Sequence, residues 1–329
     1  MDLQKNGLAL VDLDKEGVDK AFRADVLAGL AQPQKAIPAR WLYDDAGSEL
    51  FEDITQLPEY YPTRAETEIL REQGDEFREL IGAGRAVVEF GSGSSLKTPL
   101  LLRAIEPAAY VPLDISGAFL RAAAADLAAK FPGLPVYPVE ADFMREVALP
   151  DAVADMPKLG FFPGSTIGNM VPRTAVDLLR SMRATLGAGS QLLIGMDLIK
   201  DAQVLEAAYD DAAGVTAEFN LNLARRINRE LAGTIPTDKL RHRARWNDTF
   251  ARVEMHLEAL EPIEFEVSGR DFAMGEGETI HTENSHKFSH RSQHTLLLAG
   301  GWTPKRRWLD SQGRFSLILA DWTVPRGAP

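Results

Sequence analysis

Short apolar runs alternate with helical patterns through the middle of the chain. The apolar runs predict strands over 86–90, 109–114, 135–140, 158–163 and 190–197. Amphipathic or alanine-rich segments between them predict helices over 95–106, 116–130 and 172–186. Parallel strands that alternate with helices are joined by right-handed crossovers, so this order predicts an α/β fold with a doubly wound sheet.

The segments on either side of this region have a different pattern. Residues 16–31 and 46–57 predict helices, and "YYPTRAETEIL" predicts the start of a longer one. Pro62 suits the first turn of that helix, and Thr63 with Glu66 has the spacing of a capping box.

The second half of the chain predicts a further lobe. Residues 200–232 are helical in pattern, whereas 241–280 predict extended strands broken by polar turns. A helix near 286–299 and a hairpin, "RRWLD-SQG-RFSLILADW", follow. The apolar second strand of this hairpin is expected to complete the first sheet.

Composition narrows the range of functions. The 329 residues carry a formal net charge of −12 and include no cysteine, which excludes a disulfide, a thiolate nucleophile and a cysteine-ligated metal. A strongly acidic chain is a poor ligand for nucleic acid, so we expect a small-molecule substrate. We find no signal peptide and no apolar run of the roughly 18 residues that a membrane helix needs, so we expect a cytoplasmic protein without a membrane partner.

The stretch "VVEFGSGSSLKT" predicts a ligand site, because two glycines directly follow a buried strand. A dinucleotide fingerprint would need a third glycine where Leu96 stands. A site for S-adenosylmethionine needs only the glycine turn, an acid after the next strand and a polar residue after the third. Asp114 occupies the second place, and Asp142 with Phe143 the third. The sequence therefore favours S-adenosylmethionine over a nicotinamide cofactor.

Longer motifs resemble one family. "WLYDDAGSELFEDITQLPEYYPTRAETEIL", "EFGSGSSLKT", "FFPGSTIGN", "AYDDAAGVTAEFN" and "TENSHKF" are together similar to the histidine Nα-methyltransferases of ergothioneine biosynthesis. The resemblance implies a Rossmann-like class I methyltransferase domain that binds S-adenosylmethionine, formed by 64–199 and 287–329. It also implies a substrate-binding lobe, formed by 1–63 and 200–286, with histidine held between the two.

The resemblance also implies site residues. The positions that match the family's cofactor contacts are Gly91, Lys97, Asp114, Asp142 and Phe143. Those that match its substrate contacts are Tyr60, Asn169, Tyr209, Thr216, Met255, Glu283, Asn284 and Ser285. The chain departs from the expected pattern at Pro163, Asn284 and His286, which puts fine affinity in question. Taken alone, Asn169 fits a turn residue and the two tyrosines fit core aromatics, so it is the resemblance that assigns their roles.

The implied reaction is trimethylation of the α-amine of L-histidine, which gives hercynine and S-adenosylhomocysteine, in a monomeric enzyme. Asn169 is expected to accept from the amine, Tyr60 and Tyr209 to donate to the carboxylate, and Glu283 with Ser285 to recognise the imidazole. Two alternatives remain: methylation of another amino acid or small amine, and a non-catalytic regulator that binds S-adenosylmethionine.

Three histidines at four-residue spacing raise the question of a metal. His286, His290 and His294, placed on one helix, would span about 12 Å, too far to share one ion. We therefore expect no metal site.

Overall fold

The computed structural model describes residues 13–323, except 15–16, 94–96 and 116. The chain divides into two compact units: unit 1 comprises Met1–Tyr60 and Asp201–Ser285, and unit 2 comprises Tyr61–Lys200 and His286–Pro329. These bounds lie within a few residues of the predicted ones, while the assignment of cofactor to one unit and substrate to the other stays a prediction. No helix of the described residues is long and apolar enough to cross a membrane.

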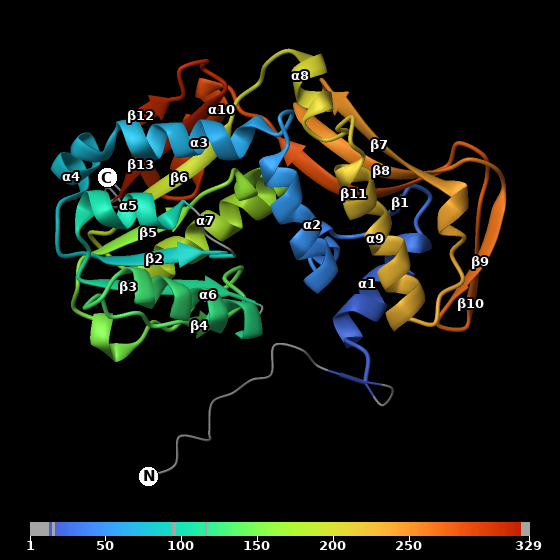
Figure 1. The fold of residues 1–329 in the computed structure, drawn as a ribbon, viewed down its shortest axis with the longest axis horizontal. Helices are drawn as coiled ribbons and strands as arrows, with labels where there is room; N and C mark the ends of the chain where they lie inside the picture. Colours follow the sequence, from blue (N-terminus) through green and yellow to red (C-terminus); the bar gives the residue numbers. More distant parts are fainter. Residues whose placement is uncertain (1–12, 15–16, 94–96, 116, 324–329) are drawn as a thin grey trace, which may run out of the picture. The chain divides into compact units, whose positions relative to one another are not determined.

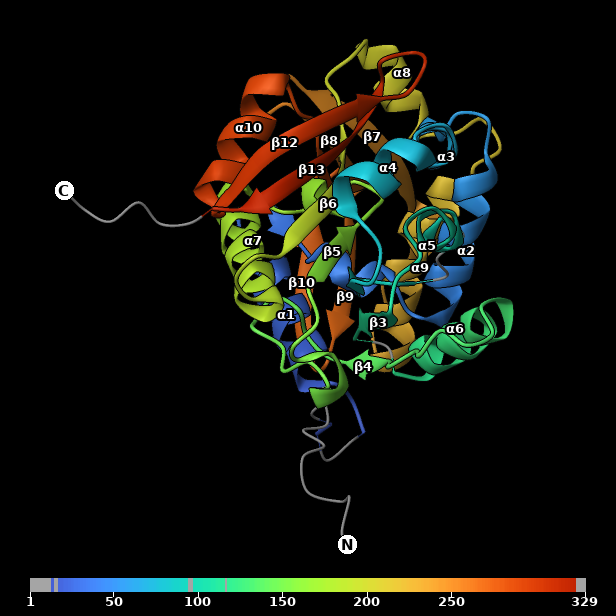
Figure 2. The same ribbon diagram turned by 90° about the vertical axis from the view of Figure 1, so that its left-hand side faces the viewer.

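Unit 2 is built on a mixed sheet (Figure 1). Its strands are β2 (Ala86–Phe90), β3 (Ala109–Asp114), β4 (Val139–Glu140), β5 (Lys158–Phe162), β6 (Gln191–Asp197), β12 (Trp302–Leu309) and β13 (Phe315–Trp322). Their order is β12-β13-β6-β5-β2-β3-β4, with β4, β3, β2, β5 and β6 parallel. The closing hairpin β12–β13 adds to β6 in antiparallel fashion, as Figure 2 shows, so its predicted place in the first sheet is confirmed.

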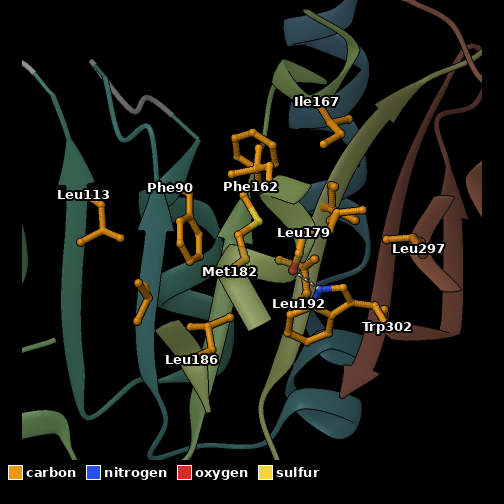
Figure 3. Packing of buried hydrophobic residues seen from close by; sticks show 14 of the residues in the cluster. Phe90, Leu113, Phe162, Ile167, Leu179, Met182, Leu186, Leu192, Leu297 and Trp302 are labelled. Atoms are coloured by element: carbon orange, nitrogen blue, oxygen red, sulfur yellow. Dashed lines mark hydrogen bonds between the residues drawn. The ribbon is translucent and has the colours of Figure 1, made fainter. Parts of the chain in front are cut away.

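Helices cover both faces of this sheet because successive strand residues point to opposite sides. They are α3 (Tyr61–Glu72), α4 (Gly74–Ile81), α5 (Thr98–Ile105), α6 (Gly117–Lys130), α7 (Pro172–Leu186) and α10 (His290–Ala299), with 3-10 turns η2 (Asp151–Val153) and η3 (Thr166–Asn169). On one face Phe90 and Phe162 pack with Met182 of α7, and the Trp302 indole donates to the Leu179 carbonyl at 2.9 Å (Figure 3). On the other face Val87 packs against α3, α4 and α5. The predicted doubly wound α/β sheet is confirmed.

Several predicted boundaries are wrong. The third strand was expected over 135–140, but β4 covers only Val139–Glu140. Val136 forms an isolated parallel bridge with Tyr110, and Pro138, between this bridge and β4, has no N–H to continue the ladder. Helix α3 already begins at Tyr61, so Thr63 lies inside it and is not its cap. The predicted helix near 286–299 begins only at His290, where Ser289 forms a capping box with Ser292. Leu96 and the first residue predicted for the helix over 116–130 lie outside the described residues.

Unit 1 combines a small sheet with helices. Its strands are β1 (Lys35–Ala36), β7 (Leu240–Asn247), β8 (Arg252–Ala259) and β11 (Thr279–His286), in the order β1-β11-β8-β7, and a separate hairpin of β9 (Ile263–Val267) and β10 (Arg270–Met274). Its helices are α1 (Lys20–Leu30), α2 (Asp45–Gln56), α8 (Ala202–Ala207) and α9 (Val215–Glu230), with 3-10 turns η1 (Ala39–Leu42) and η4 (Thr237–Lys239). Helix α9 packs against β7, β8 and α2. The last residue of β11, His286, already belongs to unit 2.

Candidate active site

The glycine turn at the carboxyl end of β2 is held by the neighbouring strand. The N–H groups of Gly91 and Ser92 both donate to the Leu113 carbonyl, at 2.9 and 3.1 Å. Gly91 has φ +71°, and a Cβ there would contact the Phe143 ring at 3.4 Å. The Gly93 N–H donates to Asp114 Oδ2 at 3.2 Å. The fold thus brings together Gly91, Asp114 and Phe143, three of the predicted cofactor residues.

Asp142 and Phe143 face different partners. The Asp142 carboxylate accepts from the Met144 N–H at 3.0 Å, so it shapes its own loop. The Phe143 ring meets Phe90 and Phe162 edge-on, with centroids 6.2 Å apart in each case. Phe143 therefore forms an apolar wall beside the glycine turn, and Asp142 supports it through the following backbone.

Lys97 forms an ion pair with Glu66, the residue that the sequence pattern predicted to cap a helix. Its ammonium lies 2.5 Å from Glu66 Oε2, which also accepts from the Gly164 N–H at 2.8 Å. Glu66 is fully buried, and its Oε1 has no hydrogen-bond partner in the structure as described. The capping role predicted for Glu66 is wrong: this carboxylate connects α3 with Lys97 and with the loop after β5.

Glu89 of β2 lies two residues before Gly91, and it was not singled out from the sequence. Its buried carboxylate accepts from the Thr98 hydroxyl at 2.7 Å and from the Tyr110 hydroxyl at 2.6 Å. Burial and the charge of Glu89 raise the pKa of Tyr110 well above its ordinary value. The sequence does contain a sign of a buried carboxylate, since one glutamate interrupts the apolar strand "AVVEF".

The loop "GSTIGN" carries Asn169 at the end of η3. Ser165 adopts φ +58°, and its Oγ accepts from the Asp197 N–H at 2.9 Å. His286 Nδ1 lies 2.8 Å from the Gly168 carbonyl oxygen, and because a carbonyl only accepts, that nitrogen carries the proton. A Cβ at position 168 would come within 2.8 Å of the His286 carbonyl, which explains the glycine before Asn169. His286, one of the departures from the family pattern, thus supports this loop. Pro163, another departure, precedes the loop and is buried.

Unit 1 brings together the predicted substrate residues Tyr60, Tyr209 and Ser285. The Tyr209 hydroxyl lies 2.7 Å from Ser285 Oγ, and the Tyr60 and Tyr209 rings meet edge-on with centroids 6.1 Å apart. All three side chains are buried. Glu283 is also buried, and because it lies two residues before Ser285 in β11, both point to the same side of the strand.

The remaining predicted residues flank this group. Met255 in β8 is buried, and its carbonyl accepts from the Thr282 hydroxyl at 3.1 Å. Thr216 is buried at the start of α9, where its N–H donates to Asp211 at 2.7 Å. Asn284 is half-buried, and its Oδ1 is a buried oxygen without a partner in the described part of the chain.

Tyr43 belongs to the same cluster, although the sequence reasoning missed it. Its ring meets Phe51 and Phe219 edge-on, with centroids 5.5 and 5.4 Å away. Burial and then the charge of Glu283 raise the pKa of its phenol well above the ordinary value. The only signal was its place in the quoted motif "WLYDD", directly before the Asp44 that caps α2.

The three spaced histidines do not lie on one helix. His286 ends β11, while His290 and His294 lie on α10. Within the described ranges, no group of histidine and acidic side chains has the arrangement of a metal site.

Comparison with known proteins adds independent findings. A family model described as "Histidine-specific methyltransferase, SAM-dependent" matches residues 22–322. The histidine N-alpha-methyltransferase of Mycolicibacterium smegmatis is 40% identical over 314 residues, which cover 94% of this chain and 97% of that protein. The enzyme of the same name from Mycobacterium tuberculosis is 41% identical over 308 residues, covering 91% of this chain and 94% of that protein.

The fold is also similar to that of a solved methyltransferase structure. The Burkholderia thailandensis 1,6-didemethyltoxoflavin-N1-methyltransferase, with S-adenosylhomocysteine bound, has a TM-score of 0.45 and 12% identity, covering 89% of this chain and 94% of that one. A likeness at this level carries no argument about substrate or site.

Proposed function

The chain belongs to the S-adenosylmethionine-dependent, histidine-specific methyltransferases, and we propose that it trimethylates the α-amine of L-histidine to give hercynine. The observation that carries this proposal is the buried group formed by Glu283, Ser285 and Tyr209, whose oxygen atoms suit an imidazole. The expected monomeric state and cytoplasmic location stay predictions.

The residues at the glycine turn fit S-adenosylmethionine. Gly91 leaves the space beside Phe143 free of a side chain, and Asp114 places a half-buried carboxylate at the end of β3, where ribose hydroxyls are bound in such sheets. Lys97 would face the carboxylate of the methionine moiety, oriented by Glu66. S-adenosylmethionine supplies the activated methyl group when it is bound.

The chain's own part in the reaction is mostly positioning. A nitrogen can attack a methyl carbon only with its lone pair free, and an α-amine with a pKa near 8 supplies a neutral fraction without a strong base. Asn169 would hold that amine through its carbonyl oxygen, and the loop that carries it is fixed by Ser165 and by His286. Orientation of this kind supplies most of the rate enhancement that such a displacement needs.

Recognition of the ring follows from counting protons. A neutral imidazole has one N–H and one acceptor nitrogen. If Glu283 accepts from the N–H, Ser285 must donate to the other nitrogen. The only role left to Tyr209 in its 2.7 Å contact is then to donate to Ser285 Oγ. We therefore assign Tyr209 to a hydrogen-bond chain that recognises the ring.

This assignment revises the role first given to Tyr209. A phenol that donates to Ser285 has no second proton for the substrate carboxylate. Tyr60 remains to donate to that carboxylate, and Tyr43, whose phenol is protonated at neutral pH, is a second donor in the same unit.

The decisive test uses purified protein with S-adenosylmethionine and L-histidine. The expected product is histidine with three added methyl groups, identified by mass. Methylation of a different amino acid in preference to histidine would support the first alternative. Binding of S-adenosylmethionine without methylation of any amino acid or small amine would support the regulator.

A further inference from the structure

A buried polar chain behind Tyr209 has no part in the mechanism so far. Asn220 of α9 and His242 of β7 are 0% and 8% exposed. Asn220 Nδ2 lies 3.0 Å from the His256 carbonyl oxygen and 2.9 Å from His242 Nδ1. His242 Nε2 in turn lies 2.7 Å from the Tyr209 carbonyl oxygen. The chain therefore runs from the backbone of β8 to the backbone of Tyr209, two residues beyond the end of α8.

The protons in this chain can be placed by elimination. The His256 carbonyl only accepts, so the nearby atom of the Asn220 amide must be its NH₂ group. That group also faces His242 Nδ1, which therefore accepts and carries no proton. The proton of the neutral ring then lies on Nε2, where it donates to the Tyr209 carbonyl. One backbone carbonyl thus determines the tautomer of the histidine.

The surroundings favour the neutral ring. Burial lowers the pKa of His242, although the Tyr209 carbonyl and the carboxylates of Asp210 and Asp211 oppose it. The Asp211 carboxylate is itself occupied by the N–H groups of Val215 and Thr216, at 3.0 and 2.7 Å. A protonated ring would place an N–H against the Asn220 NH₂ group and break the chain.

We propose that His242 and Asn220 are positioning residues that fix Tyr209 for recognition of the substrate ring. Tyr209 lies two residues beyond the end of α8, so its carbonyl is outside the hydrogen bonds of the helix, and a buried carbonyl needs a donor. His242 supplies that donor to the backbone, while Ser285 bonds the hydroxyl at the other end of the residue. This inference rests on the proposed function, because it gives Tyr209 its task.

The tautomer of His242 can be measured directly in the wild-type protein, and a variant is needed only to assign the signal. In a long-range proton–nitrogen NMR spectrum of the uniformly labelled protein, the signal of His242 is expected to show a neutral ring with its proton on Nε2 and its Nδ1 as an acceptor. His242→Gln removes that signal and so assigns it among the six histidines of the chain. A proton on Nδ1 of His242, or a charged ring at pH 7.5, would overturn the proposal.

The functional test compares two replacements at one position. His242→Gln keeps an N–H donor near the place of Nε2, whereas His242→Leu removes it. We expect His242→Leu to raise the KM for histidine about tenfold, the loss of roughly one hydrogen bond, with kcat and the Kd of S-adenosylmethionine nearly unchanged. His242→Gln should recover most of the loss. His294→Leu, which changes an exposed histidine of α10 in unit 2, is the control and should leave KM unchanged.

The outcomes separate this inference from the function on which it rests. Equal kinetics in His242→Leu and wild type would overturn the inference and leave the function standing. Equal damage in His242→Leu and His242→Gln, with the fold retained, would also overturn it. If wild type does not methylate histidine, the function fails and the labelled ring signals of Tyr209 decide the inference. A shift in His242→Leu but not in His242→Gln supports it, and no shift in either overturns it.

Discussion

At the scale of single residues, Asp114 offers the clearest test of cofactor binding. Its carboxylate is oriented by the Gly93 N–H, and it lies at the end of β3. Charge-assisted hydrogen bonds to ribose hydroxyls contribute roughly 1.5–3 kcal/mol, so Asp114→Ala should weaken S-adenosylmethionine binding by ten- to a hundredfold. Isothermal calorimetry measures this directly. Asp177→Ala, on the exposed surface of α7, is the control, and an unchanged affinity in a folded Asp114→Ala protein would refute the assignment.

In the proposed function, Glu283 is the residue on which the choice of substrate depends. An apolar side chain bound in place of the imidazole would offer no N–H to this buried carboxylate and no acceptor to the Ser285 hydroxyl, which is the kind of penalty that excludes analogues. Glu283→Ala should lower kcat/KM for histidine by roughly ten- to a hundredfold, a loss of about 1.5–3 kcal/mol. Combined with Met255→Val, which shortens a buried side chain of the same unit and is meant to make room for a larger ring, it should gain activity toward tryptophan or phenylalanine.

The measurement is kcat/KM for each amino acid at saturating cofactor. Glu264→Ala, an exposed glutamate of β9 in the same unit, is the matched control and should behave as wild type. If activity toward every amino acid falls equally in Glu283→Ala, the carboxylate supports the fold or the amine, and the proposed recognition of the ring is wrong.

At the scale of elements, the sheet of unit 1 carries a predicted dependence on pH. The rings of His256 in β8 and His281 in β11 stack with centroids 4.6 Å apart. Burial, then the neighbouring His281 and Arg245, lowers the pKa of His256 to about 4. The unfolded chain protonates this ring near pH 6.5, so between about pH 6.5 and pH 4 it binds a proton that the folded protein does not.

The free energy of unfolding should therefore carry the whole contribution of His256 above about pH 6.5. It should fall by about 2–3 kcal/mol as the pH drops toward 4. Glu254, whose pKa is about 2 because Arg252 and other partners outweigh its burial, is charged in the folded state throughout that window. Urea unfolding at pH 7.5 and pH 5 tests this, and His256→Gln should flatten the difference. An equally steep loss in His256→Gln would assign the effect to other groups.

The same elements show what the sequence could and could not predict. The strand-to-helix alternation gives the sheet of unit 2 because each strand has a local signal, and it places Gly91 and Asp114 at one edge. The helix containing Glu66 was predicted, but its partner Lys97 lies 31 residues away, and a local capping pattern led to the wrong role. His286 fitted a helical spacing locally and lies in a strand, because pairing within the sheet outweighs such a pattern.

The candidate site was predictable only in part for the same reason. The motifs named Tyr60, Tyr209, Glu283 and Ser285, yet no pattern indicates that Tyr209 and Ser285, 76 residues apart, share a hydrogen bond. Tyr43 was missed because an aromatic residue before a helix cap is ordinary. Asn220 and His242 were missed because buried polar pairs depend on the packing of a helix on a strand, which sequence periodicity does not encode.

At the scale of the whole molecule, the chain passes between the two units at Tyr60–Tyr61, Lys200–Asp201 and Ser285–His286. One buried cluster in unit 2 gathers residues next to all three passages. Asp197, which is fully buried, accepts from the Tyr61 hydroxyl at 2.6 Å, from Lys200 at 2.6 Å and from Lys287 at 2.8 Å. Burial would raise the pKa of Asp197, but the two ammonium groups outweigh it and lower the pKa.

The stability of the molecule should depend strongly on this carboxylate. Burial lowers the pKa of Lys200 to about 8 even with Asp197 beside it, so this lysine relies on the acid for its charge. Asp197→Asn leaves two buried ammonium groups without a counter-charge, and we expect it to cost about 3–5 kcal/mol in urea unfolding at pH 7. Asp177→Asn, whose carboxylate pairs only with Arg180 on the exposed surface of α7, should change stability by less than about 1 kcal/mol.

A triple variant separates the charge from the packing. Asp197→Leu with Lys200→Met and Lys287→Met removes every charge of the cluster and keeps the volume nearly constant, so it should recover most of the stability that Asp197→Asn loses. Recovery would assign the loss to the uncompensated lysines. If the triple variant is as unstable as Asp197→Asn, the uncompensated charge of the lysines does not explain the loss, and the prediction is wrong.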